Sequence, residues 1–192
     1  MTVQERINGS TAPEPFRFTL RDYLLLSESG AFNAYAKTEL IEGVIVAVNA
    51  QYSRHARLQT ALLRRLADAC DGLQGNLGAW VEVSISMSDR SMPRPDIVVS
   101  HGLPDDGPVE FASIALIVEI ADSSLGYDLG DKLRFYAAAG LAEYWVVDGN
   151  ARVIHQMWKP VGEAYKERRE MGFGEGIDAI TIEGLSIETV SL

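Results

Sequence analysis

A glutamate interrupts the most apolar segment of the chain. Glu119 lies within residues 113–121, which are apolar on both faces and are therefore expected to form a buried, central strand. Burying a carboxylate without a partner is costly or forces the group to take up a proton. We therefore expect a cation beside Glu119, unless the carboxylate reaches solvent at the strand end or pairs with an arginine.

An aspartate begins a second apolar segment. Asp96 follows Pro95 at the start of a short strand expected over residues 95–100. Taken alone, this position is more typical of an exposed edge residue. If the strand lies beside that of Glu119, however, the two carboxylates repel each other unless a metal or a proton lies between them. Mg²⁺ favours a few carboxylates together with waters and phosphate oxygens, so the pair is consistent with a site for such an ion as well as with a shared proton.

A lysine lies on the apolar side of the next predicted helix, over residues 128–139. Leu129, Leu133 and Tyr136 form its apolar stripe, and Lys132 lies between them. One interpretation is that the stem packs on the core while the ammonium reaches water. The other is that the ammonium reaches the two carboxylates, where it could orient or activate an attacking water and stabilise charge on a phosphate.

Further polar residues could complete this site. Glu39 and Glu42 belong to an apolar segment, residues 39–48, which is expected to be a strand bent at Gly43. Either glutamate could bind a metal or be a solvated edge residue. His55 lies on the apolar face of a helix expected over residues 53–69, where a hydrogen-bonded core histidine is the commoner case. Auxiliary candidates are therefore His55, Glu42, Asp122, Asp128 and Tyr136.

The remaining pattern predicts one α/β (α+β) domain over residues 16–192, with a central mixed sheet flanked by helices, after a flexible tail of residues 1–15. Thr19 can cap a short helix through Leu26. A strand is expected over residues 79–87. The sequence Asp148-Gly149-Asn150 predicts a hairpin between strands 143–148 and 152–158. The glycine-rich C-terminal part is expected to form short peripheral strands.

Composition limits the number of domains, the cellular compartment and the class of partner. The 192 residues fit one domain, and 47% of them are hydrophobic. With no apolar run long enough for a bilayer, no signal-peptide pattern and a single cysteine, Cys70, we expect a cytoplasmic protein that does not bind membranes. The net charge of −10 argues against a nucleic-acid partner, because such proteins usually present a basic surface.

Five segments together resemble a known family. They are ELIEG (residues 39–43), His55 at the start of its helix, PDIVV (95–99), IVEIADSS (117–124) and YDLGDKLRFYAAAGLAEYWVVD (127–148). In order and content they resemble the Uma (Uma two) family of restriction endonucleases, within the PD-(D/E)xK nuclease superfamily. The resemblance implies a restriction-endonuclease-like fold with a metal between Asp96 and Glu119. It also implies that Glu39 is the family's early glutamate.

The resemblance has two departures. The superfamily's lysine normally follows the glutamate as E-x-K, where this chain has Ala121. In the family this lysine has migrated to the following helix, and the matching residue is Lys132. The family commonly reads S-P-S after the strand, whereas this chain has Asp122 at the second position, which adds a carboxylate near the predicted metal.

Two hypotheses follow. The first is a Mg²⁺- or Mn²⁺-dependent endonuclease acting on DNA, with Asp96, Glu119, Lys132 and Glu39 as catalytic residues and the Ile120 carbonyl as a further metal ligand. A homodimer would suit an enzyme that cuts two strands. The second is an inactive nuclease fold kept as a binding or assembly module, which the acidic charge and Ala121 favour. A glycosidase with paired carboxylates would leave Lys132 unexplained.

Overall fold

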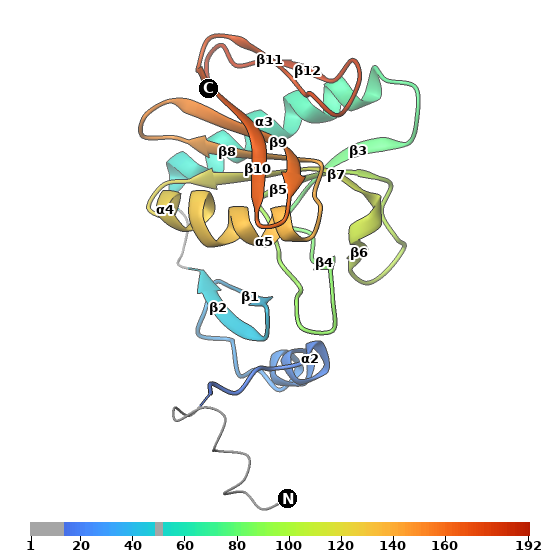
Figure 1. Ribbon diagram of the computed structural model, residues 1–192, viewed down its shortest axis with the longest axis vertical. Coiled ribbons are helices and arrows are strands. Elements are labelled where there is room, and N and C mark those ends of the chain that lie inside the picture. Colours follow the sequence, from blue (N-terminus) through green and yellow to red (C-terminus); the bar gives the residue numbers. More distant parts are fainter. Residues whose placement is uncertain (1–13, 49–51) are drawn as a thin grey trace, which may run out of the picture.

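A central sheet of six strands organises the computed structural model, which describes residues 14–48 and 52–192 (Figure 1). The strand order is β10-β9-β8-β7-β5-β3; β7 and β8 are parallel, and the other neighbours are antiparallel. This confirms the predicted mixed sheet. The strands are β3 (Leu77–Val81), β5 (Ile97–His101), β7 (Ile114–Ala121), β8 (Glu143–Asp148), β9 (Val153–Val161) and β10 (Ala164–Gly172).

One face of the sheet is covered by the long helix α3 (Ser53–Asp71). Leu58, Leu62 and Leu66 recur every fourth residue, so they lie on one side of the helix. They pack against Val118 and Ile120 of β7, among other residues. The short strands β11 (Gly176–Asp178) and β12 (Ser186–Glu188) pair with each other and contribute apolar residues to the same core.

The opposite face is covered by the helical segment that links β7 to β8. It consists of α4 (Leu125–Tyr127), the π-helical turn η2 (Asp128–Lys132) and α5 (Leu133–Ala138). Tyr136 and Leu141 are part of the core on this face, together with Ile117 of β7. The segment begins three residues before the helix predicted over 128–139. The π turn was not predicted, because side-chain periodicity does not distinguish it from an α-helix.

The N-terminal part forms a separate unit at one end of the sheet (Figure 1). It contains α2 (Leu20–Glu28) and the hairpin of β1 (Lys37–Ile41) and β2 (Val44–Val48). Thr19 caps α2 as predicted, and Asp22 returns the contact in a capping box. The segment predicted as one bent strand is thus a tight hairpin. Its turn residues Glu42 and Gly43 have φ of 48° and 77°, as a two-residue hairpin turn requires.

Backbone hydrogen bonds fasten this hairpin to the rest of the molecule. Leu40 and Met92 exchange N–H···O bonds of 3.3 and 2.7 Å, and their side chains join Tyr23 in a third apolar core. The neighbouring residues of β1, on either side of Leu40, therefore have fixed positions next to the sheet. Lys37 and Glu39 share one side of β1, because side chains alternate along a strand.

Two other predicted strands differ from the structure. Residues 79–87 do not form one strand: β3 ends at Val81, Glu82 has φ of 50°, and β4 (Ile85–Ser86) pairs with β6 (Val109–Glu110) in another sheet.

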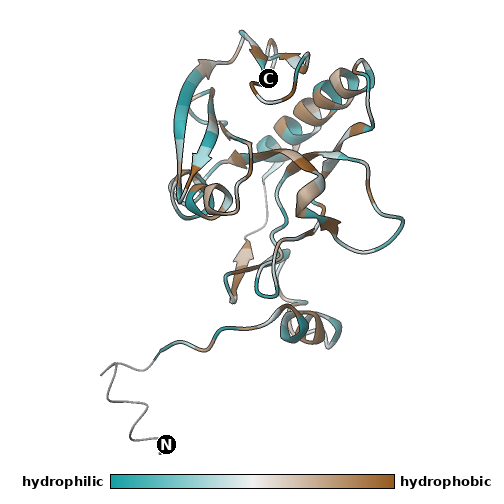
Figure 2. Ribbon diagram, turned by 45° about the vertical axis from the view of Figure 1, so that its right-hand side comes forward, coloured by the Kyte–Doolittle hydropathy of each residue, from teal (hydrophilic) through white to brown (hydrophobic). Residues whose placement is uncertain are grey.

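The hairpin at residues 148–150 is confirmed by the pairing of β8 with β9. Beyond it, β10 is longer than the peripheral strands predicted there and forms an edge of the central sheet. Figure 2 shows β10 as largely hydrophilic.

The short 3-10 turn η1 (Phe111–Ser113) leads into β7. No helix among the described residues is long and apolar enough to span a membrane. The tail predicted for residues 1–15 lies almost wholly outside the described residues.

Candidate active site

Ionisable side chains from five elements converge near the end of β7. Asp96 precedes β5, Glu119 belongs to β7, and Lys132 belongs to η2. Lys37 and Glu39 come from β1, and His55 from α3; all of these side chains are buried. A cavity of about 590 Å³ lies over this cluster, and Lys37, His55, Asp96, Glu119, Ile120 and Lys132 are among the residues that line it.

Glu119 is 3% exposed and points to the helical segment, on the same side of β7 as Ile117. Its Oε1 accepts hydrogen bonds from Lys132 Nζ at 2.8 Å and from the Tyr136 hydroxyl at 3.2 Å. The carboxylate therefore neither reaches solvent nor pairs with an arginine, and its cation is Lys132. Burial raises the pKa of Glu119, the ammonium of Lys132 opposes the rise, and the negative charge of Asp96 adds to it.

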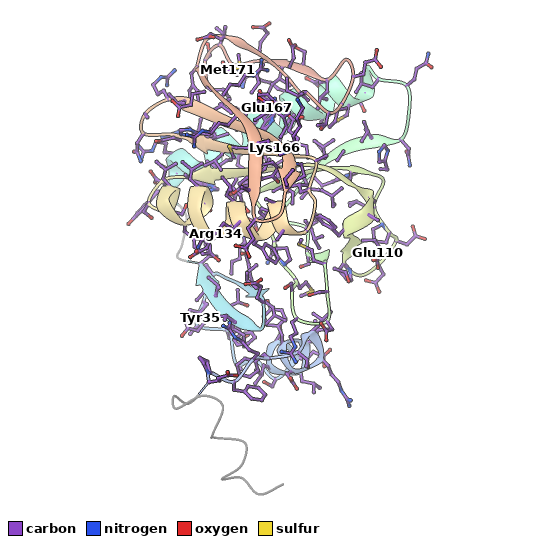
Figure 3. All side chains as sticks on the ribbon, in the orientation of Figure 1. Tyr35, Glu110, Arg134, Lys166, Glu167 and Met171 are labelled. Carbon is purple, nitrogen blue, oxygen red and sulfur yellow. The ribbon has the colours of Figure 1, made fainter. Side chains whose placement is uncertain are left out.

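Lys132 is 4% exposed, so its ammonium does not reach water. Besides Glu119, its Nζ lies 3.3 Å from Glu39 Oε2. Burial alone would lower the pKa of Lys132, but the carboxylates of Glu119 and Glu39 outweigh it and raise this pKa above its usual value. Arg134, two residues further on, is exposed instead (Figure 3). Residues two positions apart lie on nearly opposite sides of a helical segment, so Lys132 faces the core while Arg134 faces solvent.

Asp96 is held by two donors on one oxygen. The backbone N–H of Ile120 donates to Asp96 Oδ2 at 2.8 Å, and His55 Nε2 lies 3.0 Å from the same atom. This contact exists because β5 pairs with β7 only from Ile97 onward, so the aspartate side chain takes the place of a partner strand beside Ile120. Burial would raise the pKa of Asp96, but the His55 hydrogen bond and the Lys37 charge outweigh it and lower the pKa to about 2.

A second buried lysine was not predicted. Lys37 is 8% exposed, and its Nζ lies 3.6 Å from Glu39 Oε1 and 3.7 Å from Asp96 Oδ1. In the structure Lys37 lies two residues before Glu39 and shares its side of β1. It was missed because it lies before the strand expected over residues 39–48, so the sequence assigned it to no face of a strand.

The buried charges of this cluster do not balance. Asp96, Glu119, Glu39 and Asp128 are each at most 4% exposed, whereas the buried ammonium groups beside them in the described chain are Lys37 and Lys132. Four carboxyl groups thus face two lysines. Burial also raises the pKa of Asp128, against the hydrogen bond from the Ser124 hydroxyl. Burial also raises the pKa of Glu119, to about 8, so either proton uptake or a divalent cation can offset the excess of negative charge.

Glu143 shows how the same sheet treats a carboxylate that needs no cation. It is fully buried on β8, and one oxygen accepts hydrogen bonds from the side chains of Trp145 and Gln156. The other accepts the N–H groups of Ile180 and Thr181 and the Thr181 hydroxyl. By contrast, Glu39 Oε2 accepts no hydrogen bond from any described residue. Neutral donors therefore satisfy Glu143, whereas Glu39 receives one backbone N–H, from Arg94 to Oε1, and otherwise lies beside the charges of Lys37 and Lys132.

The remaining predicted residues divide into two groups. Tyr136 and Asp128 belong to the cluster: Tyr136 bonds to Glu119, and Asp128 lines the cavity. Asp122 also lines the cavity but is partly exposed and pairs with Arg54. Glu42 is exposed in the hairpin turn, apart from the cluster. On the outer side of α3, Arg57 and Arg64 are exposed, and Arg65 donates to the Val190 carbonyl.

The cluster fits a Mg²⁺-type ion better than a zinc-type ion. No set of three or more His, Cys, Asp or Glu side chains in residues 14–48 and 52–192 is arranged to hold a metal by itself. Mg²⁺ needs only one or two carboxylates, since waters and phosphate oxygens complete its shell. Asp96 and Glu119, which both line the cavity, are two carboxylates that such an ion could use. The Ile120 carbonyl also points toward Asp96, because a strand residue directs its N–H and C=O to the same side.

Comparison with known proteins identifies the family and the fold of the chain. The family model Uma2, described as "Putative restriction endonuclease", matches residues 20–190. The chain belongs to the Uma2 family. Its fold is also that of a crystal structure described as "a putative nuclease belonging to DUF820" from Anabaena variabilis ATCC 29413. That structure has 17% sequence identity and a TM-score of 0.64, over 86% of this chain and 89% of the other.

No curated protein matches the chain. Family membership and fold nevertheless place this Uma2 protein among the nuclease-like proteins, and the resemblance inferred from its motifs is confirmed.

The lowered pKa of Asp96 predicts a defined loss of stability in acid. Because this pKa is near 2 in the folded protein and near 3.8 when unperturbed, Asp96 stabilises the fold above about pH 4 and less as the pH falls toward 2. In EDTA, we expect the difference in free energy of unfolding between wild type and Asp96→Asn to shrink by about 1 kcal/mol from pH 6 to pH 3.

Urea unfolding at several pH values measures this difference. Asp105→Asn, which removes a carboxylate from an exposed loop, controls for the change in net charge. A difference between wild type and Asp96→Asn that stays constant down to pH 3 would show that His55, Lys37 and Ile120 do not stabilise ionised Asp96.

Proposed function

We propose that this Uma2 protein is a divalent-metal-dependent endonuclease that hydrolyses phosphodiester bonds, with DNA as substrate. The observation that carries the proposal is the buried ammonium of Lys132, which lies 2.8 Å from Glu119 and 3.3 Å from Glu39 under the same cavity as Asp96. A purely structural core has no need to bury four carboxyl groups around two lysines, because each buried charge carries a desolvation cost.

Asp96 and Glu119 would hold Mg²⁺ or Mn²⁺, with the Ile120 carbonyl as a further ligand. Such an ion, when bound, polarises the scissile phosphate and favours attack by water. His55 and the Ile120 N–H hold Asp96 Oδ2 in place, so the aspartate keeps its orientation and its charge. His55 would therefore position a metal ligand and not bind the metal.

Lys132 would take the role of the lysine that Ala121 does not provide. Its raised pKa keeps it as an ammonium, which favours orienting the attacking water and stabilising phosphate charge over removing a proton. Glu39 would keep this ammonium in position from the side of the hairpin, and Tyr136 would hold Glu119 from the helix. The migrated lysine would thus act on the site from η2 instead of from β7.

The net charge of −10 does not oppose a nucleic-acid substrate as strongly as it first suggests. Four of the acidic groups are buried in the cluster, where a divalent ion would offset two of their charges. The exposed Arg57 and Arg64 on α3 could bind backbone phosphates beside the site. A homodimer would bring two such sites to the two strands of a duplex.

Metal binding can be tested before any substrate is known. We expect Mn²⁺ titrated into the wild-type protein to give a saturable heat of one ion per chain, and Asp96→Ala to abolish it, because the variant lacks one of the two carboxylate ligands. Isothermal titration calorimetry measures both, and circular dichroism verifies that the variant is folded.

Glu42→Gln is the matched control. It removes a carboxylate from the exposed turn of the β1–β2 hairpin, apart from the cluster, and should leave the heat unchanged. The absence of Mn²⁺-dependent heat in the wild type would contradict the proposed metal site.

A non-catalytic binding or assembly module is the second candidate. It is favoured by one specific observation: Asp122 at the cavity wall pairs with Arg54, which removes one basic group from the approach of a phosphate.

Cleavage assays distinguish the two functions. On single- and double-stranded DNA and on RNA with Mn²⁺, we expect wild-type cleavage and a loss of about 100-fold or more in Lys132→Ala, because a preorganised charge at the phosphate is removed. Arg134→Ala, on the exposed side of the same segment, should cleave as wild type does. A wild type that binds Mn²⁺ but cleaves none of these substrates would favour the module.

A further inference from the structure

Lys37 is the buried charged group that the proposed mechanism leaves without a role. It lines the cavity together with Asp96, Glu119 and Lys132. Lysine is rarely buried without a reason, because taking an ammonium out of water is costly unless it is paired. Nothing in the packing of β1 requires a charged residue there, since Leu40 on the other side of the strand supplies the contact with the third core.

The two lysines of the site are held in different ways. Lys132 donates a hydrogen bond of 2.8 Å to Glu119, and the ring of Tyr127 lies 5.9 Å from its ammonium. Lys37 lies 3.6 and 3.7 Å from Glu39 and Asp96, beyond the usual range of a hydrogen bond, about 2.7–3.2 Å. Charge attraction thus keeps Lys37 near the acids without fixing its ammonium, and its flexible four-carbon stem lets that ammonium turn.

The position of Lys37 relative to Asp96 is informative. Asp96 Oδ2 is hydrogen-bonded to His55 and to the Ile120 N–H. The Lys37 ammonium lies beside the second oxygen, Oδ1. A metal ion bound through Oδ1 would therefore lie on the side of Asp96 that the Lys37 ammonium occupies. In the metal-free protein, Lys37 partly substitutes for that ion by shielding the charges of Asp96 and Glu39.

We propose that Lys37 is a second functional lysine of the site, which shields Asp96 and Glu39 when no metal is bound and binds a phosphate oxygen of the substrate when a metal is. This inference rests on the proposed function. It assigns the two lysines separate tasks: Lys132 is fixed by Glu119 and Glu39, whereas Lys37 changes its partner from carboxylate to phosphate.

The surroundings of the cavity explain why a phosphate would need Lys37. Asp96, Glu119, Asp122 and Asp128 all line the cavity, so an incoming phosphate meets mostly negative charge. Lys132 already divides its charge between two carboxylates, and Arg54 at the side of Asp122 is paired as well. Lys37 is the cavity-lining cation with the longest and weakest contacts to its acids.

The first test uses the metal alone. In Lys37→Met the competing charge is absent, so we expect calorimetry to give a dissociation constant for Mn²⁺ about tenfold lower than in wild type, from Coulomb repulsion removed at a few ångströms. A lysine that merely supports the fold predicts the opposite sign, since its loss would disturb Asp96 and weaken Mn²⁺ binding. Lys166→Met makes the same charge change at an exposed position of the edge strand β10, three strands away from β7, and should not alter Mn²⁺ affinity.

The second test uses thymidine 5′-monophosphate titrated into the Mn²⁺-saturated protein. We expect Lys37→Met to weaken its binding by about tenfold, the range for loss of a hydrogen bond to a charged group. Lys37→Arg keeps the charge and should restore binding to within about threefold of wild type. If Lys37→Met does not fold, Lys37→Gln, which keeps a polar head, replaces it in both titrations.

The outcomes separate this inference from the proposed function. A wild type that binds no Mn²⁺ would overturn the metal-dependent nuclease itself. A wild type that binds Mn²⁺, with Lys37 variants unchanged in both affinities or weakened in Mn²⁺ affinity, would overturn the role of Lys37 alone.

Discussion

The buried ammonium of Lys132, shared between Glu119 and Glu39, is the interaction on which the rest of the site depends. It joins the three parts of the molecule: the central strand β7, the helical segment and the N-terminal hairpin. Each carboxylate would be strongly destabilising without it, because removing one partner of a buried ion pair leaves an uncompensated charge, at a cost of about 3–5 kcal/mol. The cluster therefore holds the hairpin over the sheet while it also concentrates charge under a cavity.

The local structure around β7 follows from this need to place charged groups. The antiparallel pairing of β5 with β7 begins at Ile97 and leaves the Ile120 N–H to the side chain of Asp96. The π turn in η2 carries Lys132, and π turns inside helices are frequent at functional sites. Glu143 lies on β8, the strand next to β7. It shows that the same sheet can bury a carboxylate by means of neutral donors alone.

Much of this arrangement could be predicted from the sequence, because Glu119, Asp96 and Lys132 each break an apolar pattern. Such a break is visible within a single strand or helix. The family resemblance added the role of Glu39 and the order of the segments, and the family and fold comparisons confirmed both family and fold. The hairpin at residues 148–150 was predictable for the same local reason, since its turn residues have their own geometric preferences.

Lys37 and the contact between His55 and Asp96 could not be predicted in this way. Lys37 lies in a segment with no clear periodicity. Its buried ammonium lies beside two acids: Glu39, on its own strand, and Asp96, which is more than fifty residues away in the sequence. His55 reads as a core histidine from its helix alone, and only the fold brings it to Asp96. The split of residues 79–87 into β3 and β4 was missed because it depends on pairing with distant strands.

The most direct test of the central claim is a crystal structure of the protein soaked with Mn²⁺, in which anomalous scattering locates the ion. A peak between Asp96 and Glu119, with Lys132 still beside Glu119, is the result expected of a metal-dependent nuclease centre. A soaked crystal with no anomalous peak between Asp96 and Glu119, whether or not Mn²⁺ binds elsewhere, would contradict the proposed metal centre.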